Sequence, residues 1–118
     1  MRLFLVIAVL LFSFSSSAGA ACNRNEHGVF EDPACASEAL AIADKELNII
    51  YKRLVAQVDA EAKTKLRASQ RAWLAYRKSD AGLAYAIEGN GSAGRMVWAN
   101  LSEQATQARI KELKSWLR

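Results

Sequence analysis

Apolar residues recur at spacings of three and four over much of the chain beyond residue 32, which is the pattern of amphipathic helices. The first helix is expected to begin near Asp32, because Asp32 can cap the first turn and Pro33, which has no amide proton, suits the first helical position. Its core-facing stripe consists of Leu40, Ala43, Leu47, Ile50, Tyr51, Leu54 and Val58.

A second helix is predicted from about Ala60 to Glu88, with Asp59 as its cap. The loop after it, residues 89–94, contains three glycines that accept left-handed backbone angles. Ser92 can then cap a third helix, from about Ala93 to Leu117. The second stripe is Leu66, Gln70, Trp73, Leu74, Arg77, Ala81 and Ala84, and the third is Val97, Leu101, Ala105, Ala108, Leu113, Trp116 and Leu117.

No useful apolar alternation of period two appears, so strands are not expected. Short connections make consecutive helices antiparallel, which predicts an all-α, antiparallel three-helix bundle with a long helical hairpin. Equal rise per residue pairs positions across the first turn: Asn48 faces Gln70, Tyr51 faces Arg67, and Asp44 lies about one turn from Arg77.

These positions predict a polar seam inside the bundle, made of Asp44, Asn48, Tyr51, Arg67, Gln70, Trp73 and Arg77. The four members from the second helix could instead form a binding face. We favour the seam, because Gln70 and Trp73 interrupt the apolar stripe and do not face away from it.

The first twenty residues have the layout of a secretory signal: Met1 and Arg2, an apolar run from Leu3 to Phe14, then small and polar residues. The run is too short to span a bilayer. We expect cleavage before Ala21 and one domain over residues 21–118, periplasmic or secreted and without a transmembrane span. Lipidation of Cys22 is less favoured, because the three preceding residues lack a large aliphatic side chain.

Export makes a disulfide between the two cysteines, Cys22 and Cys35, the favoured interpretation, and two free thiols the alternative. The net charge gives little information about function. The full chain has 16 basic and 12 acidic residues, and Arg2 is the only charged residue lost with the signal, which leaves a net charge of +3. That charge is interleaved with acidic residues, so nucleic acid is not an expected partner.

Catalytic chemistry has few candidates in this sequence. His27 is the only histidine and is expected to be a solvated loop residue, since no second histidine can join it in a metal or nucleophile site. Carboxylates such as Asp44, Glu46 and Glu61 lie among lysines and arginines, where surface ion pairing explains them. The glycines of 89–94 join two helices and do not form a phosphate cradle. We expect no enzyme activity, metal or cofactor.

The chain resembles the LprI-like lysozyme-inhibitor family. The resemblance rests on Cys35, on the stretch 43–51, and on the stretch 66–77 with its Leu-Arg-x-x-Gln-x-x-Trp core and following arginine. Gly91 with Ser92, and Thr106 with Arg109, extend it. Members commonly carry a second cysteine pair where Ala81 and Leu101 stand here, positions that should lie opposite each other in a hairpin turning near Asn90.

The resemblance implies an envelope protein that binds and inhibits lysozyme or another muramidase. Candidate contacts are Asn90, Ser92 and Arg95, because loops enter clefts more readily than helix faces do. Many lysozymes are basic, so a basic side chain entering the acidic catalytic cleft would have to supply the charge complementarity. The alternative is a non-inhibitory envelope interaction module. The target and oligomeric state stay open, as does whether Trp98 and Trp116 are core or a dimer patch.

Overall fold

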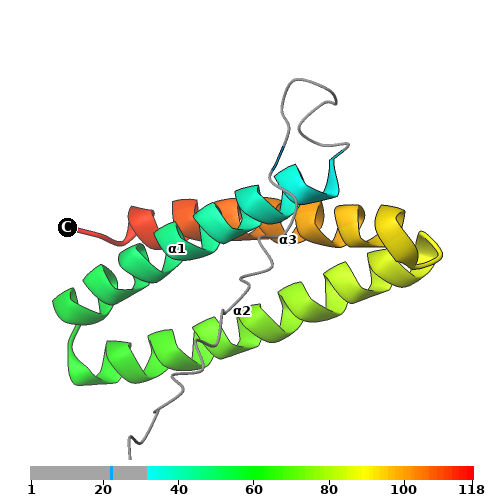
Figure 1. Ribbon diagram of the computed structural model, residues 1–118. Helices are drawn as coiled ribbons and strands as arrows, with labels where there is room; N and C mark the ends of the chain where they lie inside the picture. The colour runs from blue at the N-terminus through cyan, green and yellow to red at the C-terminus, as the bar shows by residue number, and fades with distance from the viewer. Residues whose placement is uncertain (1–21, 23–31) are drawn as a thin grey trace, which may run out of the picture.

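The computed structural model describes residue 22 and residues 32–118, which form three helices joined by short turns (Figure 1). They are α1 (Pro33–Gln57), α2 (Ala60–Ile87) and α3 (Gly91–Ser115). Because α2 returns the chain, α1 and α3 run in the same direction. This part of the chain contains no strand, which confirms the all-α bundle.

The first two helices begin at the residues predicted to cap them. The Ala34 amide donates to Asp32 Oδ1 at 2.8 Å, and the Ala62 amide donates to Asp59 Oδ1 at 2.8 Å. Each carboxylate satisfies an amide that has no partner within its own helix. Between the helices, Val58 and Asp59 have extended backbones, so the reversal takes two residues.

The start of α3 differs from the prediction. The helix begins at Gly91 with Asn90 at the capping position and no side-chain cap, so Ser92 lies inside the first turn and is not the cap. Gly89, Asn90 and Gly91 have φ of 79°, 67° and 71°. Three consecutive residues with positive φ reverse the chain tightly, and helical geometry resumes before Ser92 is reached.

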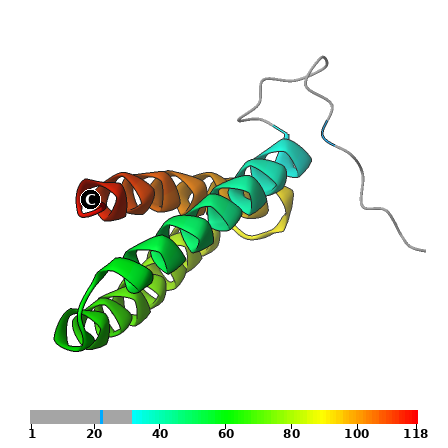
Figure 2. The ribbon, with the colours of Figure 1, turned by 90° about the vertical axis from the view of Figure 1, so that its left-hand side faces the viewer.

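The core forms mainly where α1 packs against α3. The predicted stripe of α1 is confirmed, with Tyr51 and Val58 half-buried and its other members buried. Figure 2 shows α1 and α3 running at an angle to each other, and at the C-terminal end the Arg118 amide donates to Oε1 of Gln57, the last residue of α1, at 3.0 Å. The buried apolar cluster consists of Leu47, Ile50, Leu54, Leu66, Ile110 and Leu113.

The predicted apolar face of α3 is partly wrong. Leu113 is buried, but Ala108 is exposed and Trp116 is 51% exposed. The buried face carries polar residues, which the apolar pattern assigned to the surface. Its members are Gly94, Ala99, Ser102, Thr106, Arg109, Ile110 and Leu113.

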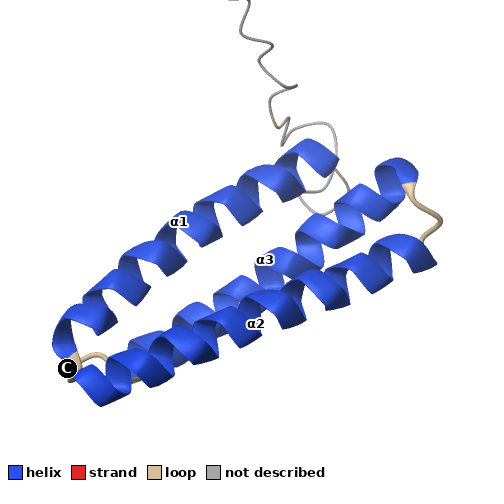
Figure 3. Ribbon diagram, turned by 90° about the horizontal axis from the view of Figure 1, so that it is seen from below, coloured by secondary structure: helices blue, strands red, loops and turns tan. Residues whose placement is uncertain are grey.

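The long hairpin consists of α2 and α3 (Figure 3). Gly94 lies against Tyr85 near the turn, and further along the hairpin Arg77 contacts Thr106. In the antiparallel register that these contacts define, position 81 lies across from position 101, as the hairpin argument predicts. Ala81 is buried there.

The disulfide between Cys22 and Cys35 is present and ties residue 22 to the first turn of α1. None of the helices in the described part of the chain is long and apolar enough to cross a membrane. The predicted signal peptide over residues 1–20 and the loop residue His27 lie outside the described residues.

Gly94 is the glycine whose replacement should destabilise the hairpin. A Cβ at this position would lie 2.9 Å from a Tyr85 ring carbon and 3.0 Å from its backbone oxygen. We therefore expect Gly94→Ala to lower the free energy of unfolding by about 1–3 kcal/mol, the usual cost of overpacking. Chemical denaturation of the purified protein measures this change.

Gly82→Ala is the matched control, since a Cβ there meets nothing within 4 Å and the residue lies inside α2. Alanine favours the helix over glycine, so this variant should gain about 0.5–1 kcal/mol. Equal effects of the two substitutions would contradict the close packing of the hairpin at Gly94.

Candidate functional site

A polar network joins all three helices at their centre. Arg77 of α2 donates through Nη1 to Asp44 Oδ1 of α1 at 2.5 Å and to Thr106 Oγ1 of α3 at 2.7 Å. The Thr106 hydroxyl in turn donates to the Ser102 carbonyl at 2.7 Å. The predicted proximity of Asp44 and Arg77 is confirmed.

Trp73 has two guanidinium groups near its ring in this network. The Arg77 Cζ is 5.0 Å and the Arg109 Cζ is 6.0 Å from the centroid of its ring. Both distances are within the range of cation–π attraction. The indole ring therefore attracts two cations inside the bundle.

Arg109 is the second centre of the network and is only 5% exposed. Its Nε donates to Gln70 Oε1 at 3.0 Å and its Nη2 to Ser69 Oγ at 2.8 Å, both on α2. Its Nη1 donates to Glu112 Oε2 at 2.9 Å, one turn further along α3. A buried arginine with this many partners holds α2 against α3.

Thr106 and Arg109 are network members that sequence reasoning did not place there. Hydropathy assigns an arginine and a threonine on a helix to the solvent side, so periodicity alone cannot find them. The signal that could have found them was the family resemblance, which includes both residues but gives no reason for their presence.

Three predicted seam residues do not join the network. Asn48 and Arg67 are exposed and Tyr51 is half-buried. They line a cleft of ≈ 550 Å³ between α1 and α2, whose wall also includes Gln70 and Arg71. Asp44 and Arg77 form an ion pair across α1 and α2, but open space separates the two helices beside these three residues.

The turn between α2 and α3 (Figure 1) contains Asn90, the first of the predicted inhibitory residues, and Ser92 and Arg95 follow in the first turns of α3. All three are exposed. The backbone of the turn is held in place, because the Asn90 amide donates to the Tyr85 carbonyl at 3.1 Å. Asn90 has φ 67° and ψ −164°, a region nearly restricted to glycine. Because Asn90 has a side chain, this backbone conformation lowers the stability of the fold. The shape of the turn is kept at that cost.

Arg95 is the basic side chain next to this turn. Its Nη2 donates to Ser92 Oγ at 3.1 Å, and no carboxylate of the described residues forms an ion pair with it. Its positive charge is therefore available to a partner.

The surface has further features that could bind other molecules. Tyr76, Leu83 and Ile87 are exposed on one side of α2 at spacings of seven and four. A second hollow, of ≈ 970 Å³, lies at the end formed by the α1–α2 turn and the C-terminus, with Trp116 in its wall. Trp98 is also exposed, so neither Trp98 nor Trp116 belongs to the core.

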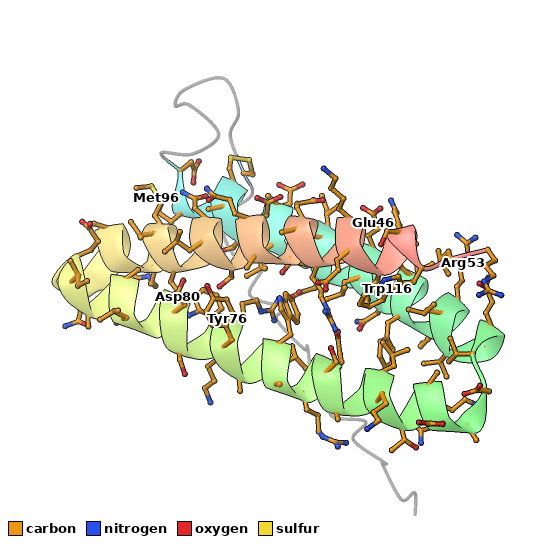
Figure 4. The ribbon with its side chains drawn as sticks, turned by 180° about the vertical axis from the view of Figure 1, so that it is seen from behind. Glu46, Arg53, Tyr76, Asp80, Met96 and Trp116 are labelled. Atoms are coloured by element: carbon orange, nitrogen blue, oxygen red, sulfur yellow. A yellow bond between two sulfur atoms is a disulfide. The ribbon has the colours of Figure 1, made fainter. Side chains whose placement is uncertain are left out.

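Acidic side chains are engaged in ion pairs at the surface and inside the bundle. Glu46 of α1 accepts from Lys114 of α3 at 2.6 Å, beside the C-terminal turns of α3 (Figure 4). Asp44 pairs with Arg77. Among residue 22 and residues 32–118, no group of three or more histidine, cysteine or acidic side chains could hold a metal ion.

The chain matches a protein family described as lysozyme inhibitor LprI, and the match covers residues 22–113. No curated protein and no solved structure matches the chain significantly. The match includes all three helices apart from the last two residues of α3.

Proposed function

This chain belongs to the lysozyme inhibitor LprI family, and from that we propose that it is an exported, non-catalytic envelope protein that binds lysozyme-type muramidases and inhibits them. The observation that carries the proposal is the family match over nearly the whole predicted mature chain.

Export is supported by two features. The N-terminal residues have the layout of a secretory signal, and the Cys22–Cys35 disulfide suits an oxidising compartment. We therefore propose that the protein acts in the periplasm or outside the cell, where peptidoglycan and the muramidases that cleave it are found.

The α2–α3 turn is the proposed inhibitory contact. Asn90 and Ser92 are exposed, and the positive φ angles of residues 89–91 fix the shape of the turn before any partner arrives. Preorganisation of this kind lowers the entropy lost on binding. Arg95 adds a positive charge beside the turn, which suits the pair of carboxylates that lysozyme-type enzymes use for catalysis.

Cell-wall lysis measures the proposed activity. The purified mature protein is titrated into lysozymes of several structural classes, and the loss of turbidity of a cell-wall suspension is followed. We expect lysis by at least one class to slow in proportion to added protein and to stop near equimolar ratio. Undiminished lysis by every class at a large molar excess would leave the protein as an interaction module only.

Arg95→Ala should weaken inhibition of the responsive muramidase by about tenfold, which corresponds to about 1.4 kcal/mol for one exposed charge placed against carboxylates. The inhibition constant from the lysis assay measures the effect. Arg53→Ala is the matched control, because Arg53 is exposed on α1 and distant from the turn. Equal inhibition by wild type and both variants would place the contact elsewhere.

A second candidate function is favoured by the exposed apolar residues of α2. Tyr76, Leu83 and Ile87 could form a docking surface for another envelope protein. Under this alternative, Leu83→Asp abolishes partner binding while lysozymes remain fully active in the presence of the wild-type protein.

A further inference from the structure

The cleft between α1 and α2 has an unbalanced positive charge. Arg67, Arg71 and Arg77 line it together with a single carboxylate, Asp44. Asp44 already accepts a hydrogen bond from Arg77 at 2.5 Å, so that carboxylate is neutralised within the wall. The two remaining arginines make no ion pair or hydrogen bond with the described residues. Two guanidinium groups without an anionic partner thus border one open cleft.

The other polar groups of the cleft are rich in donors. Gln70 accepts from Arg109 through Oε1, which leaves its amide NH₂ group to donate. Asn48 and Tyr51 add an amide and a hydroxyl from the opposite helix. Leu47 and Leu74 supply apolar wall. Guanidinium and amide donors around an apolar wall suit an organic anion that also carries hydroxyl or amide groups.

The cleft has the size of a small-molecule site. Its volume of ≈ 550 Å³ lies within the usual range of about 300–1,000 Å³ for ligand pockets. The base of the cleft is also fixed, because the Asp44–Arg77–Thr106 contacts hold α1 and α2 through α3.

We propose that this cleft binds a small saccharide or saccharide–peptide that carries a carboxylate, with Arg67 and Arg71 as the anion-binding residues. The preference for an anion follows from the charge of the cleft alone. The choice of a cell-wall fragment rests on the proposed function, because muramic acid sugars carry a carboxylate and occur where muramidases act.

Isothermal titration calorimetry at low ionic strength tests the proposal on the mature protein without any muramidase. N-acetylmuramic acid and N-acetylglucosamine form a matched ligand pair, because they differ by the lactyl group and its carboxylate. We expect N-acetylmuramic acid to bind and N-acetylglucosamine not to bind. Binding of muramyl dipeptide alone would also support the site and would assign the recognised carboxylate to the peptide.

The double variant Arg67→Ala/Arg71→Ala should lose at least about tenfold in affinity, since each guanidinium–carboxylate hydrogen bond is strong. Both side chains are exposed and without partners in the described structure, so the variant should keep the wild-type melting temperature. Arg53→Ala should bind like wild type.

Three results would overturn the proposal: no binding of either carboxylate ligand at millimolar concentration, equal binding of N-acetylglucosamine or inorganic phosphate, or unchanged binding by the double variant. Because the assay contains no muramidase, its failure is separate from failure of the lysis experiment.

Discussion

Leu113→Ala is expected to destabilise the protein by about 2–5 kcal/mol, the largest effect of any single truncation considered for this chain. The side chain of Leu113 is fully buried, at 0% exposure, in the cluster that joins all three helices. Truncation removes buried apolar surface and leaves a cavity between packed helices. A domain of this size has a total stability of about 5–15 kcal/mol, so a large fraction would be lost.

Thermal and urea unfolding followed by circular dichroism measure this loss. Leu83→Ala is the matched control, because it makes the same substitution in a helix at a position that is 59% exposed. Its effect should stay within about 0.5 kcal/mol. A Leu113→Ala protein as stable as the Leu83→Ala protein would show that α3 does not pack against α1 as described.

Arg109→Ala is expected to cost roughly 2–4 kcal/mol, because a buried guanidinium loses charge-assisted hydrogen bonds and its packed hydrocarbon stem. The substitution removes the bonds to Gln70, Ser69 and Glu112 and one cation that faces the Trp73 ring. The variant should therefore unfold at lower urea concentration.

Arg53→Ala separates burial from charge, since it also removes one arginine from a helix but at an exposed position. It should change stability by less than about 0.5 kcal/mol. Tryptophan fluorescence, to which Trp73 contributes together with Trp98 and Trp116, should shift in Arg109→Ala and not in Arg53→Ala, because Arg109 lies near the Trp73 ring. If the two variants were equally stable, Arg109 would contribute no more than an exposed arginine does, and the buried network would not stabilise the bundle.

The sequence predicts α1 well for a physical reason. Its buried positions are almost all aliphatic and its cap is an aspartate followed by proline, so apolar spacing and capping both identify it. The caps at Asp32 and Asp59 depend on local bonds within three residues, which a linear pattern can represent.

The face of α3 could not be predicted in the same way. Thr106 and Arg109 are buried because partners on α2 and within α3 satisfy their polar atoms. Ser102 is buried on the same face, where its carbonyl accepts from Thr106 and its Oγ has no hydrogen-bond partner among the described residues. Such partnerships are three-dimensional. The hydropathy pattern shows only that these residues are polar. The core face that it predicts for α3 therefore excludes them.

The candidate site residues show the same contrast between what the sequence pattern predicts and what depends on the three-dimensional packing. Antiparallel register alone placed Asp44 about one turn from Arg77, because the rise per residue is equal in both helices, and the two side chains form an ion pair. It could not predict that α1 packs on α3 and leaves a cleft beside Asn48 and Arg67, since that depends on how three helices share one core. The start of α3 was misplaced because a strained Asn90 was not expected.

Association with a muramidase is the central claim, and sedimentation velocity measures it most directly. The mature protein is mixed with each class of lysozyme at about 50 µM, where a Kd of ~1 µM gives mostly complex. We expect a new 1:1 species with at least one class, and its loss in competition with an active-site ligand of that enzyme. Independent sedimentation of both proteins with every class would contradict the proposed function.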